Sequence, residues 1–436
     1  MSKYLITTAL EETWPTSSNI IFLGEWCKLY NRRNIWESYN YETLPYHWDK
    51  KDKREQDYLY LQNFYESLLP LIAKNLNEIH NVKKSLKYWR IIIGPWLSYF
   101  TKVVFDRWSS ISYSLNNKDI SKTILLKNFN FNKIPDSFSE FRRLCIDDLW
   151  NYNLFEQILL NNNNIKFINS KKNISITKFN VEKQQEKQRN HWLKKTINSL
   201  TNSFTKDDDI AIYSTGLNIK DQLKLNKKLN QVYNYNYIPE NNFLINNVSL
   251  RNWELDYNSR DAYESFLISI IPQNIPRLYL EGYKILKDES KKLKMPNNPK
   301  YILTGHLDNE LFKEYTANKI DKGSKLVICQ HGGGPFHKFN GNVEHNIKIC
   351  DLYLSTGKGN MNISGKIKNA GQLYNSRKKV KFNSKGLLTL FQVLMPRYSS
   401  DLRSFAVSSQ ILNYLDEQFL FINNLNKKIK NKSIVR

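Results

Sequence analysis

The sequence predicts an α/β protein built on a doubly wound, Rossmann-like parallel sheet. In the last third of the chain, short β-rich apolar runs at 300–305, 325–329 and 351–357 alternate with a helical pattern at 308–319. These runs are continuous rather than alternating, which is typical of strands buried on both faces. Each run ends in turn-forming residues, and ligands of open α/β sheets bind at the carboxyl ends of the strands.

The most distinctive motif follows the run 325–329, where His331 precedes Gly332, Gly333 and Gly334. Glycines allow the backbone to approach a ligand closely, and their N–H groups can form an anion cradle. An imidazole beside such a cradle is suited to act as a general base. The motif therefore predicts a catalytic His331 with an anion-binding glycine loop. The alternative is a glycine turn beside an incidental histidine.

Two apolar runs at 4–10 and 19–24 predict strands near the N-terminus, and carboxylates follow both of them. Glu11 comes after the first run and Glu25 after the second. If all these strands belong to one parallel sheet, Glu11 and Glu25 lie on the same edge as His331. Both are candidate catalytic residues. The alternative for each is a helix-start residue that the helix dipole favours.

Between about residues 53 and 113 the pattern becomes helical, and residues 115–200 are mixed with further helices, which predicts a helical insertion at about 53–200 in the first domain. The aromatic residues between 88 and 108 recur at helical spacing, as in a core helix. Arg90 and Arg107 interrupt this aromatic stretch, and a buried guanidinium requires an anion. We therefore take Arg90 as a candidate phosphate-binding residue. Further helices are expected at 137–160, 181–201, 261–279 and 404–424.

A second candidate phosphate contact is Lys358, which stands between two glycines after the run 351–357. The spacing differs from that of a P-loop. Near the C-terminus, an apolar strand at 387–395 precedes the helix at 404–424. We expect residues 1–380 to form the first domain and residues 381–436 to begin a second Rossmann-like domain that is incomplete. An isolated strand–helix unit of this kind is expected to expose apolar surface.

The composition limits the possible partners. The 65 lysine and arginine residues outnumber the 41 acidic residues, which gives a net charge of +24 and attraction to polyanions. No nucleic-acid-binding motif is present, so a specific nucleic-acid partner is not expected. Nucleotide-activated substrates and an anionic membrane face remain as candidate partners.

The 4 cysteines are scattered without metal-ligand spacing, which fits a reducing cytoplasm and predicts no metal site. The chain starts without a signal peptide pattern and has no run of 18 apolar residues. A cytoplasmic protein is expected.

Several longer stretches resemble a bacterial family of transferases found with O-antigen and other surface-carbohydrate genes. The matching runs are Leu5-Ile-Thr-Thr-Ala-Leu-Glu-Glu-Thr-Trp-Pro15, Phe22-Leu-Gly-Glu-Trp-Cys27, Leu44-Pro-Tyr-His-Trp-Asp49, Tyr88-Trp-Arg-Ile-Ile-Ile-Gly-Pro-Trp-Leu97, Gln330-His-Gly-Gly-Gly334 and Met395-Pro-Arg-Tyr-Ser399. The resemblance implies a two-domain glycosyltransferase of the GT-B type. Such an enzyme moves a sugar from a nucleotide-activated donor to a glycan or lipid-linked acceptor, with no further cofactor, and contacts the anionic inner membrane peripherally.

The resemblance also implies a role for one residue. His331 is similar in setting to the histidine of the His-Gly turn in glycerophosphotransferases, where it serves as the base. In our own hypothesis for such an enzyme, His331, or a carboxylate among Glu11 and Glu25, takes the proton of the acceptor hydroxyl. Arg397, Lys358 and the glycine amides neutralise the leaving phosphate. Members of the family continue beyond residue 436, so a C-terminally truncated chain with reduced activity is expected. The alternative is a non-catalytic remnant or partner subunit that binds an anionic glycan or another chain.

Overall fold

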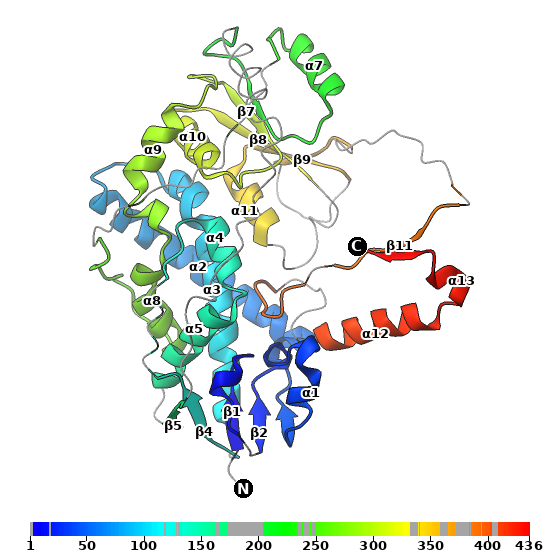
Figure 1. Cartoon of the computed structure of the whole chain (residues 1–436). Coiled ribbons are helices and arrows are strands. Elements are labelled where there is room, and N and C mark those ends of the chain that lie inside the picture. Colours follow the sequence, from blue (N-terminus) through cyan, green and yellow to red (C-terminus); the bar gives the residue numbers. More distant parts are fainter. Residues whose placement is uncertain are drawn as a thin grey trace.

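Figure 1 shows the computed structural model of the chain. It describes residues 3–16, 19–116, 119–127, 133–161, 165–171, 204–233, 250–331, 341–357, 365–371, 385–393, 395–402 and 409–436, together with the single positions 129, 131, 238, 245, 339 and 383. The helix that we expected at 181–201 lies outside these residues.

The N-terminal part of the chain forms a parallel sheet, called sheet A here. Its strands lie in the order β3-β2-β1-β4-β5. They are β1 (Lys3–Ile6), β2 (Ile20–Phe22), β3 (Tyr41–Thr43), β4 (Ile120–Leu125) and β5 (Lys166–Asn169). The order reverses between β1 and β4, as in Rossmann folds. The α/β class and the Rossmann-like arrangement are thus confirmed.

A second parallel sheet, sheet B, lies at the other end of the molecule (Figure 1). Its strands lie in the order β10-β9-β8-β7-β6. They are β6 (Ala211–Tyr213), β7 (Tyr301–Thr304), β8 (Lys325–Cys329), β9 (Leu352–Ser355) and β10 (Ile367–Asn369). The strands expected at 300–305, 325–329 and 351–357 are confirmed as β7, β8 and β9. The division at residue 380 stays a prediction, but the part before it contains two sheets.

Helices α2 (Lys51–Ile79) and α3 (Leu86–Leu115) lie between the sheets and connect them. Helix α3 packs against α2, against α5 beside sheet A, and against α10 and α11 beside sheet B. The expected helical insertion at 53–200 is therefore partly wrong, because β4 and β5 of sheet A fall inside it. The two long helices form the core that both sheets share.

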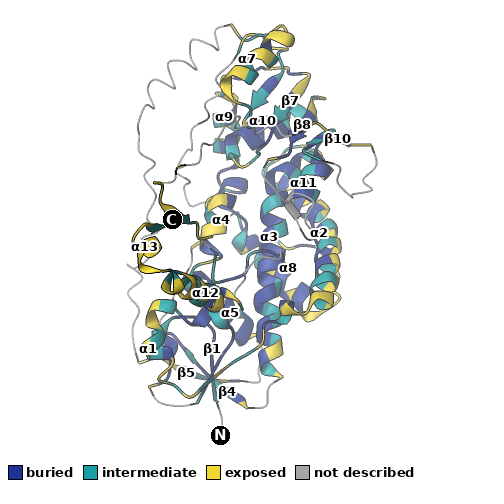
Figure 2. Cartoon of the chain, turned by 90° about the vertical axis from the view of Figure 1, so that its right-hand side faces the viewer, coloured by how far each residue is buried: buried dark blue, intermediate teal, exposed yellow. Residues whose placement is uncertain are grey.

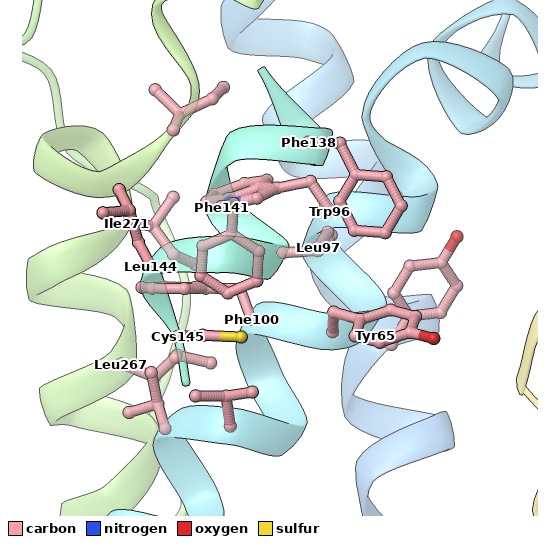
Figure 3. Close-up of a cluster of buried hydrophobic side chains, with 14 of the residues drawn as sticks. Tyr65, Trp96, Leu97, Phe100, Phe138, Phe141, Leu144, Cys145, Leu267 and Ile271 are labelled. Atoms are coloured by element: carbon pink, nitrogen blue, oxygen red, sulfur yellow. The ribbon is translucent and has the colours of Figure 1, made fainter. Parts of the chain in front are cut away.

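The buried side of α3 explains why this helix forms. Trp89, Trp96, Leu97 and Phe100 are buried, and so are many neighbours at three- and four-residue spacing. Figure 3 shows Trp96, Leu97 and Phe100 packed against side chains of α2, α4 and α8. At the start of α3, the side chain of Ser85 accepts a hydrogen bond from the Tyr88 N–H. The aromatic stretch is thus core, as predicted.

The remaining helices cover the sheets and the central pair. They are α1 (Arg33–Trp36), α4 (Phe138–Leu144), α5 (Asp148–Leu160), α7 (Ile219–Lys228), α8 (Ala262–Asn274), α9 (Tyr283–Lys291), α10 (Glu310–Asp321) and α11 (Gly341–Ile349). Short 3-10 turns are η1 (Glu11–Thr13), η2 (Glu25–Cys27), η3 (Tyr30–Arg32), η4 (His47–Asp49) and η6 (Arg277–Tyr279). The helices expected at 137–160, 261–279 and 308–319 correspond to α4 with α5, to α8, and to α10.

The C-terminal segment forms a separate strand–helix–strand unit. Strands β11 (Leu388–Leu390) and β12 (Ser433–Val435) pair in parallel, and α12 (Ile411–Asn424) and α13 (Lys427–Lys430) connect them. Helix α12 is tied to η3 and α1: Asp416 accepts hydrogen bonds from Arg33 at 2.8 and 3.0 Å and from the Tyr30 hydroxyl at 2.9 Å. The strand expected at 387–395 and the helix expected at 404–424 are therefore found, in shorter form, as β11 and α12. Their assignment to a second Rossmann-like domain stays a prediction.

This unit exposes apolar side chains, as predicted. Phe391 is 72% exposed and Val393 is 62% exposed, and Phe419, Leu420 and Phe421 of α12 are also exposed. Figure 2 shows α12 and α13 largely in the colour of exposed residues, in contrast to α3. Exposed apolar patches of this kind favour self-association or partner binding.

Substituting both Phe391 and Val393 by Ser should reduce concentration-dependent association, which light scattering after size exclusion can measure. The melting temperature should stay nearly constant, because exposed substitutions usually change stability by no more than about 0.5 kcal/mol. Phe100→Ala, a core control, should cost about 3–5 kcal/mol. A large drop in melting temperature for the double variant would contradict the exposure of this segment.

A second prediction concerns Glu314, a carboxyl group that is buried between α3, α9 and α10. It accepts a hydrogen bond from the Tyr88 hydroxyl, which also contacts the Tyr283 hydroxyl at 2.8 Å. Burial raises the pKa of Glu314 from its ordinary value of 4.5 to about 7. The folded chain therefore holds this proton where the unfolded chain has released it. Stability should fall as pH rises from about 4.5 to about 7 and then level off.

Glu314→Gln removes that loss. The variant should be more stable than the natural chain above pH 7, by on the order of 1–3 kcal/mol, with no gain near pH 4.5. Denaturant unfolding at several pH values measures this difference, and Glu417→Gln on the exposed face of α12 is the control. A gain that is the same at every pH would show that Glu314 is ionised in the folded chain.

Candidate functional site

The carboxyl edge of sheet B brings two histidines together. Strands β7 and β8 are parallel neighbours, with Thr304 in register with Ile328. His306 follows β7 and His331 follows β8, so both chains leave the sheet at the same edge. The two imidazole rings lie 3.7 Å apart between centroids. Asp308 Oδ2 is 3.7 Å from Nδ1 of His306. A carboxylate, an imidazole and a second imidazole therefore stand in a row.

The electrostatic surroundings keep His331 neutral. Desolvation, and then the neighbouring His306, lower the pKa of His331 below its ordinary value of 6.5. Asp308 has a lowered pKa because it contacts His306. His331 is exposed at the protein surface. A neutral, accessible imidazole can accept a proton at pH 7, which is the property that a general base needs.

Backbone contacts fix the ends of the strands around these histidines. The Gln330 side-chain oxygen accepts a hydrogen bond from the Thr356 N–H at 2.8 Å, which ties the end of β8 to the end of β9. Gly305 lies so close to the Ser214 carbonyl that an added Cβ would be 2.8 Å from it. Only glycine fits this approach of β7 to β6.

Part of the predicted anion cradle falls outside the described residues. This applies to Gly332, Gly333 and Gly334 after His331, and to Lys358 after β9. Their contacts with phosphate stay predictions.

The carboxylates after the first two strands do not belong to this edge. Glu11 and Glu25 follow β1 and β2 in sheet A, whereas His331 follows β8 in sheet B. The prediction that all three share one sheet edge is therefore wrong. The apolar runs that precede them look alike in sequence, and run composition carries no information about which sheet a strand joins.

Both carboxylates are paired with cations of the segment that follows β2. Glu11 accepts two hydrogen bonds from Arg32, both at 2.7 Å. Glu25 contacts Lys28 at 2.8 Å, and Lys28 also donates to the Thr43 hydroxyl. These ion pairs give Glu11 and Glu25 a structural role within the fold. The catalytic role that we assigned to them stays a prediction.

The guanidinium of Arg90 contacts a protein carboxylate. Arg90 donates two hydrogen bonds to Glu66, at 2.8 and 2.7 Å, and Lys348 of α11 contacts the same carboxylate at 2.7 Å. Desolvation opposes ionisation of Glu66, but the two cations outweigh it and lower its pKa to about 2. The anion that Arg90 requires is therefore Glu66, and its contact with phosphate stays a prediction.

Arg397 lies at the carboxyl edge of sheet A. It donates to the Trp26 carbonyl of η2 and to Asp148 at the start of α5, the latter at 2.5 Å. The adjoining Tyr398 is buried and donates to the other oxygen of Asp148 at 2.5 Å. The Trp26 ring packs against both Tyr398 and Phe155. Protein side chains thus fill this part of the edge.

Sequence reasoning missed a buried polar cluster between η4 and α3. His47 Nε2 lies 2.9 Å from Asp106 Oδ1, and both side chains are at most 4% exposed. The Tyr46 hydroxyl donates to the same oxygen at 2.7 Å, and Arg107 contacts the other oxygen at 2.5 Å. Arg107 was expected to need an anion, and Asp106 beside it in sequence provides the anion.

Ionised Asp106 is favoured by this cluster. Burial opposes its charge, but Arg107, His47 and Tyr46 together outweigh burial, so the pKa of Asp106 lies below its ordinary value of 3.8. An ionised carboxylate accepts hydrogen bonds only. The hydrogen between Asp106 and His47 therefore belongs to Nε2.

Two sequence signals could have indicated the missed residues. His306 is the second residue after β7, as His331 is the second residue after β8. His47 lies in the run Leu44-Pro-Tyr-His-Trp-Asp49 and is the fourth residue after β3.

Two kinds of feature are absent from the part of the chain that the structure describes. That part contains no group of three or more His, Cys, Asp or Glu residues placed to hold a metal ion. It also contains no helix that is long and apolar enough to cross a membrane.

These features define a Rossmann-like α/β protein with titratable side chains at the ends of its parallel strands. The chain belongs to a family of transferases, because the model of the LIC12162 family transferase matches residues 3–436. No curated protein and no solved structure matches the chain. The resemblance to a transferase family is thereby confirmed.

Removing the carboxylate of the buried cluster should be costly. Asp106→Ala leaves the Arg107 guanidinium buried without its counter-ion, and such changes cost about 3–5 kcal/mol. Denaturant unfolding measures the loss. Glu11→Ala removes a carboxylate that pairs with the partly exposed Arg32, and should cost no more than about 1 kcal/mol. If the two variants lost equal free energy of unfolding, Asp106 would not be the counter-ion on which the buried Arg107 depends.

Proposed function

We propose that this protein is a glycosyltransferase-like enzyme of bacterial surface polysaccharide biosynthesis, with O-antigen as the representative product. It would move a sugar from a nucleotide-activated donor to a glycan or lipid-linked acceptor. The observation that carries the proposal is the pair of histidines at the neighbouring carboxyl ends of β7 and β8. Membership of a transferase family supports the reaction type.

The chemistry of transfer assigns a role to each group. The neutral imidazole of His331 accepts the proton of the acceptor hydroxyl as its oxygen bonds to the sugar of the donor. Asp308 would stabilise the imidazolium that forms, because its carboxylate raises the pKa of His331, whereas the neighbouring His306 lowers that pKa and keeps the resting ring neutral. The leaving phosphate departs with the bonding electron pair. The glycine amides after His331 would stabilise its charge, together with Lys358.

The proposal places the enzyme in the cytoplasm, at the inner face of the membrane. A net charge of +24 favours contact with an anionic lipid surface and with nucleotide substrates. No cofactor beyond the nucleotide-sugar donor is part of the proposal.

A second candidate function is a non-catalytic partner subunit that binds another chain or an anionic glycan. The exposed apolar side chains of β11 and α12 favour it, because such patches mark interaction surfaces. Calorimetric titration with a panel of nucleotide sugars separates the two candidates. Saturable binding of one donor supports the enzyme, and the absence of binding by every donor supports the partner subunit.

The role of His331 is tested by His331→Gln. An exposed side chain at a strand end contributes little to folding, so stability should change by no more than about 1 kcal/mol. The rate of sugar transfer to the acceptor should fall about 10²–10⁴-fold, the usual contribution of general acid–base catalysis. Donor binding measured by calorimetry should persist.

The matched control is Lys325→Gln, at the exposed start of the same strand. It should leave the transfer rate unchanged. If His331→Gln lowered the melting temperature by many degrees while turnover per folded molecule stayed the same, His331 would be a structural turn residue.

A further inference from the structure

The basic residues of the chain are concentrated towards its C-terminal end. Residues 352–400 contain 9 lysine and arginine residues and no acidic residue. Residues 418–436 contain 5 more and again no acidic residue. These two stretches supply more than half of the net charge of +24. Strand β11 lies in the first stretch and β12 in the second, so their pairing brings the two basic stretches together.

The pairing of β11 with β12 determines which side chains share a face of this small sheet. Leu390 is in register with Val435. The next residue, Arg436, donates its N–H to the Leu390 carbonyl at 2.9 Å and accepts from the Gln392 N–H at 2.8 Å. Arg436 therefore lies opposite Phe391. Residues that lie opposite each other on neighbouring strands point to the same face of the sheet.

The face that Phe391 and Arg436 share is apolar and exposed. Side chains alternate along a strand, so Leu387 points to the same face as Phe391, and Lys432 lies opposite Leu387. Leu387 is 56% exposed, and Phe391 is more exposed still. The equally exposed Val393 extends this apolar surface towards α12, because its N–H donates to a tyrosine hydroxyl of that helix at 3.1 Å.

Exposed cations adjoin these apolar side chains. Lys432 and Arg436 of the sheet face are both exposed. Helix α13, which ends shortly before β12, adds the exposed residues Lys427, Lys428 and Lys430 (Figure 2). A bilayer with anionic headgroups matches both kinds of side chain. The boundary between its headgroups and acyl chains receives apolar side chains, and its phosphates attract lysine and arginine.

The charges select this occupant over two others. A second copy of the chain would bring the same cations to the contact, and their repulsion keeps self-association through this surface weak. A nucleic acid would neutralise the cations but leave the apolar side chains in water. An anionic bilayer neutralises the cations and also covers the apolar side chains.

We infer that one face of the C-terminal unit is a docking surface for an anionic phospholipid bilayer. This C-terminal docking surface consists of Leu387, Phe391, Val393, Lys432 and Arg436, with the lysines of α13 beside it. The inference rests on the proposed function in one respect, since a lipid-linked acceptor would place the substrate of the enzyme in that bilayer. It goes further by assigning the membrane contact to one surface of the chain.

Vesicle flotation tests the surface on the unaltered chain. The probes are vesicles of phosphatidylcholine alone and vesicles of phosphatidylcholine with an equal amount of phosphatidylglycerol. The chain should float with the anionic vesicles and much less with the neutral ones. Binding should fall when salt is raised from about 0.1 M to about 1 M, because the screening length drops from about 10 Å to about 3 Å. Equal binding to both kinds of vesicle, or binding to neither, would overturn the inference.

Phe391→Ser combined with Val393→Ser tests the apolar part of the surface. Affinity for the anionic vesicles should fall at least about tenfold, because these side chains no longer transfer from water into the bilayer. The matched control is Ile219→Ser combined with Leu223→Ser on α7, where both residues are exposed and Asp221 lies between them in sequence. Helix α7 lies apart from the C-terminal unit (Figure 1). The control should bind like the unaltered chain, and equal losses for the two pairs would contradict the assignment.

Lys428→Gln combined with Lys432→Gln tests the cations. Affinity for the anionic vesicles should fall about 25-fold, since each cation close to an anionic bilayer contributes about fivefold. Lys227→Gln combined with Lys228→Gln removes the same charge from exposed positions at the end of α7 and should have a much smaller effect. If the two pairs of changes had the same effect, only the net charge would matter and the surface would be wrongly assigned.

Other occupants of the surface give different results. Random-sequence RNA that binds more tightly than the anionic vesicles, and is released by the lysine changes but not by the serine changes, would assign the surface to polyanions. A stable dimer in light scattering that the anionic vesicles leave intact would assign it to a second copy. Either outcome would overturn the inference. Neither donor nor acceptor is present in these assays, so the result is independent of whether the proposed sugar transfer occurs.

Discussion

The burial of the Arg107 guanidinium is the constraint on which the rest of the structure depends. Its hydrogen bonds reach Asp106 beside it, the Asn151 side chain of α5, and the carbonyls of Cys145 and Ser399. A charged group at 1% exposure is tolerated only when its donors are satisfied. This one side chain thereby joins α3, the segments around α5 and the C-terminal segment. The position of residues 396–402 against sheet A follows from it.

The same helix provides the connection between the sheets. Residues of α3 face sheet A through Asp106 and Arg107, and sheet B through Tyr88 and Arg90. Because the helix is continuous over Leu86–Leu115 and its side chains are tightly buried, it holds the two carboxyl edges in a fixed relation. A transferase must place two substrates side by side, and a rigid connection between two parallel sheets serves that purpose.

The sequence was sufficient to predict local structure wherever one pattern dominated. Continuous apolar runs identified β7, β8 and β9, and helical spacing identified α3 and α10. Strands β3, β4 and β10 were missed. The pattern Tyr41-Glu-Thr43 is short and polar, and β4 lies in a region of mixed pattern that follows the long helices. Short strands of this kind form because neighbours in the sheet supply their hydrogen bonds, which is a tertiary effect.

The site was predicted less completely than the fold, for a related reason. His331 was found because it follows its strand directly, but its neighbour His306 depends on the pairing of β7 with β8. The assignment of Glu11 and Glu25 to the same edge was wrong, since sheet membership is a long-range property. His47 and Asp106 are 59 residues apart in sequence, and only the packing of η4 on α3 brings them together.

The most direct test of the account is an experimental structure of the protein with a bound nucleotide sugar. We expect the diphosphate to lie at the carboxyl edge of sheet B, in contact with the chain that leaves β8 at His331. A nucleotide bound away from the carboxyl ends of β7, β8 and β9 would contradict the proposed reaction site.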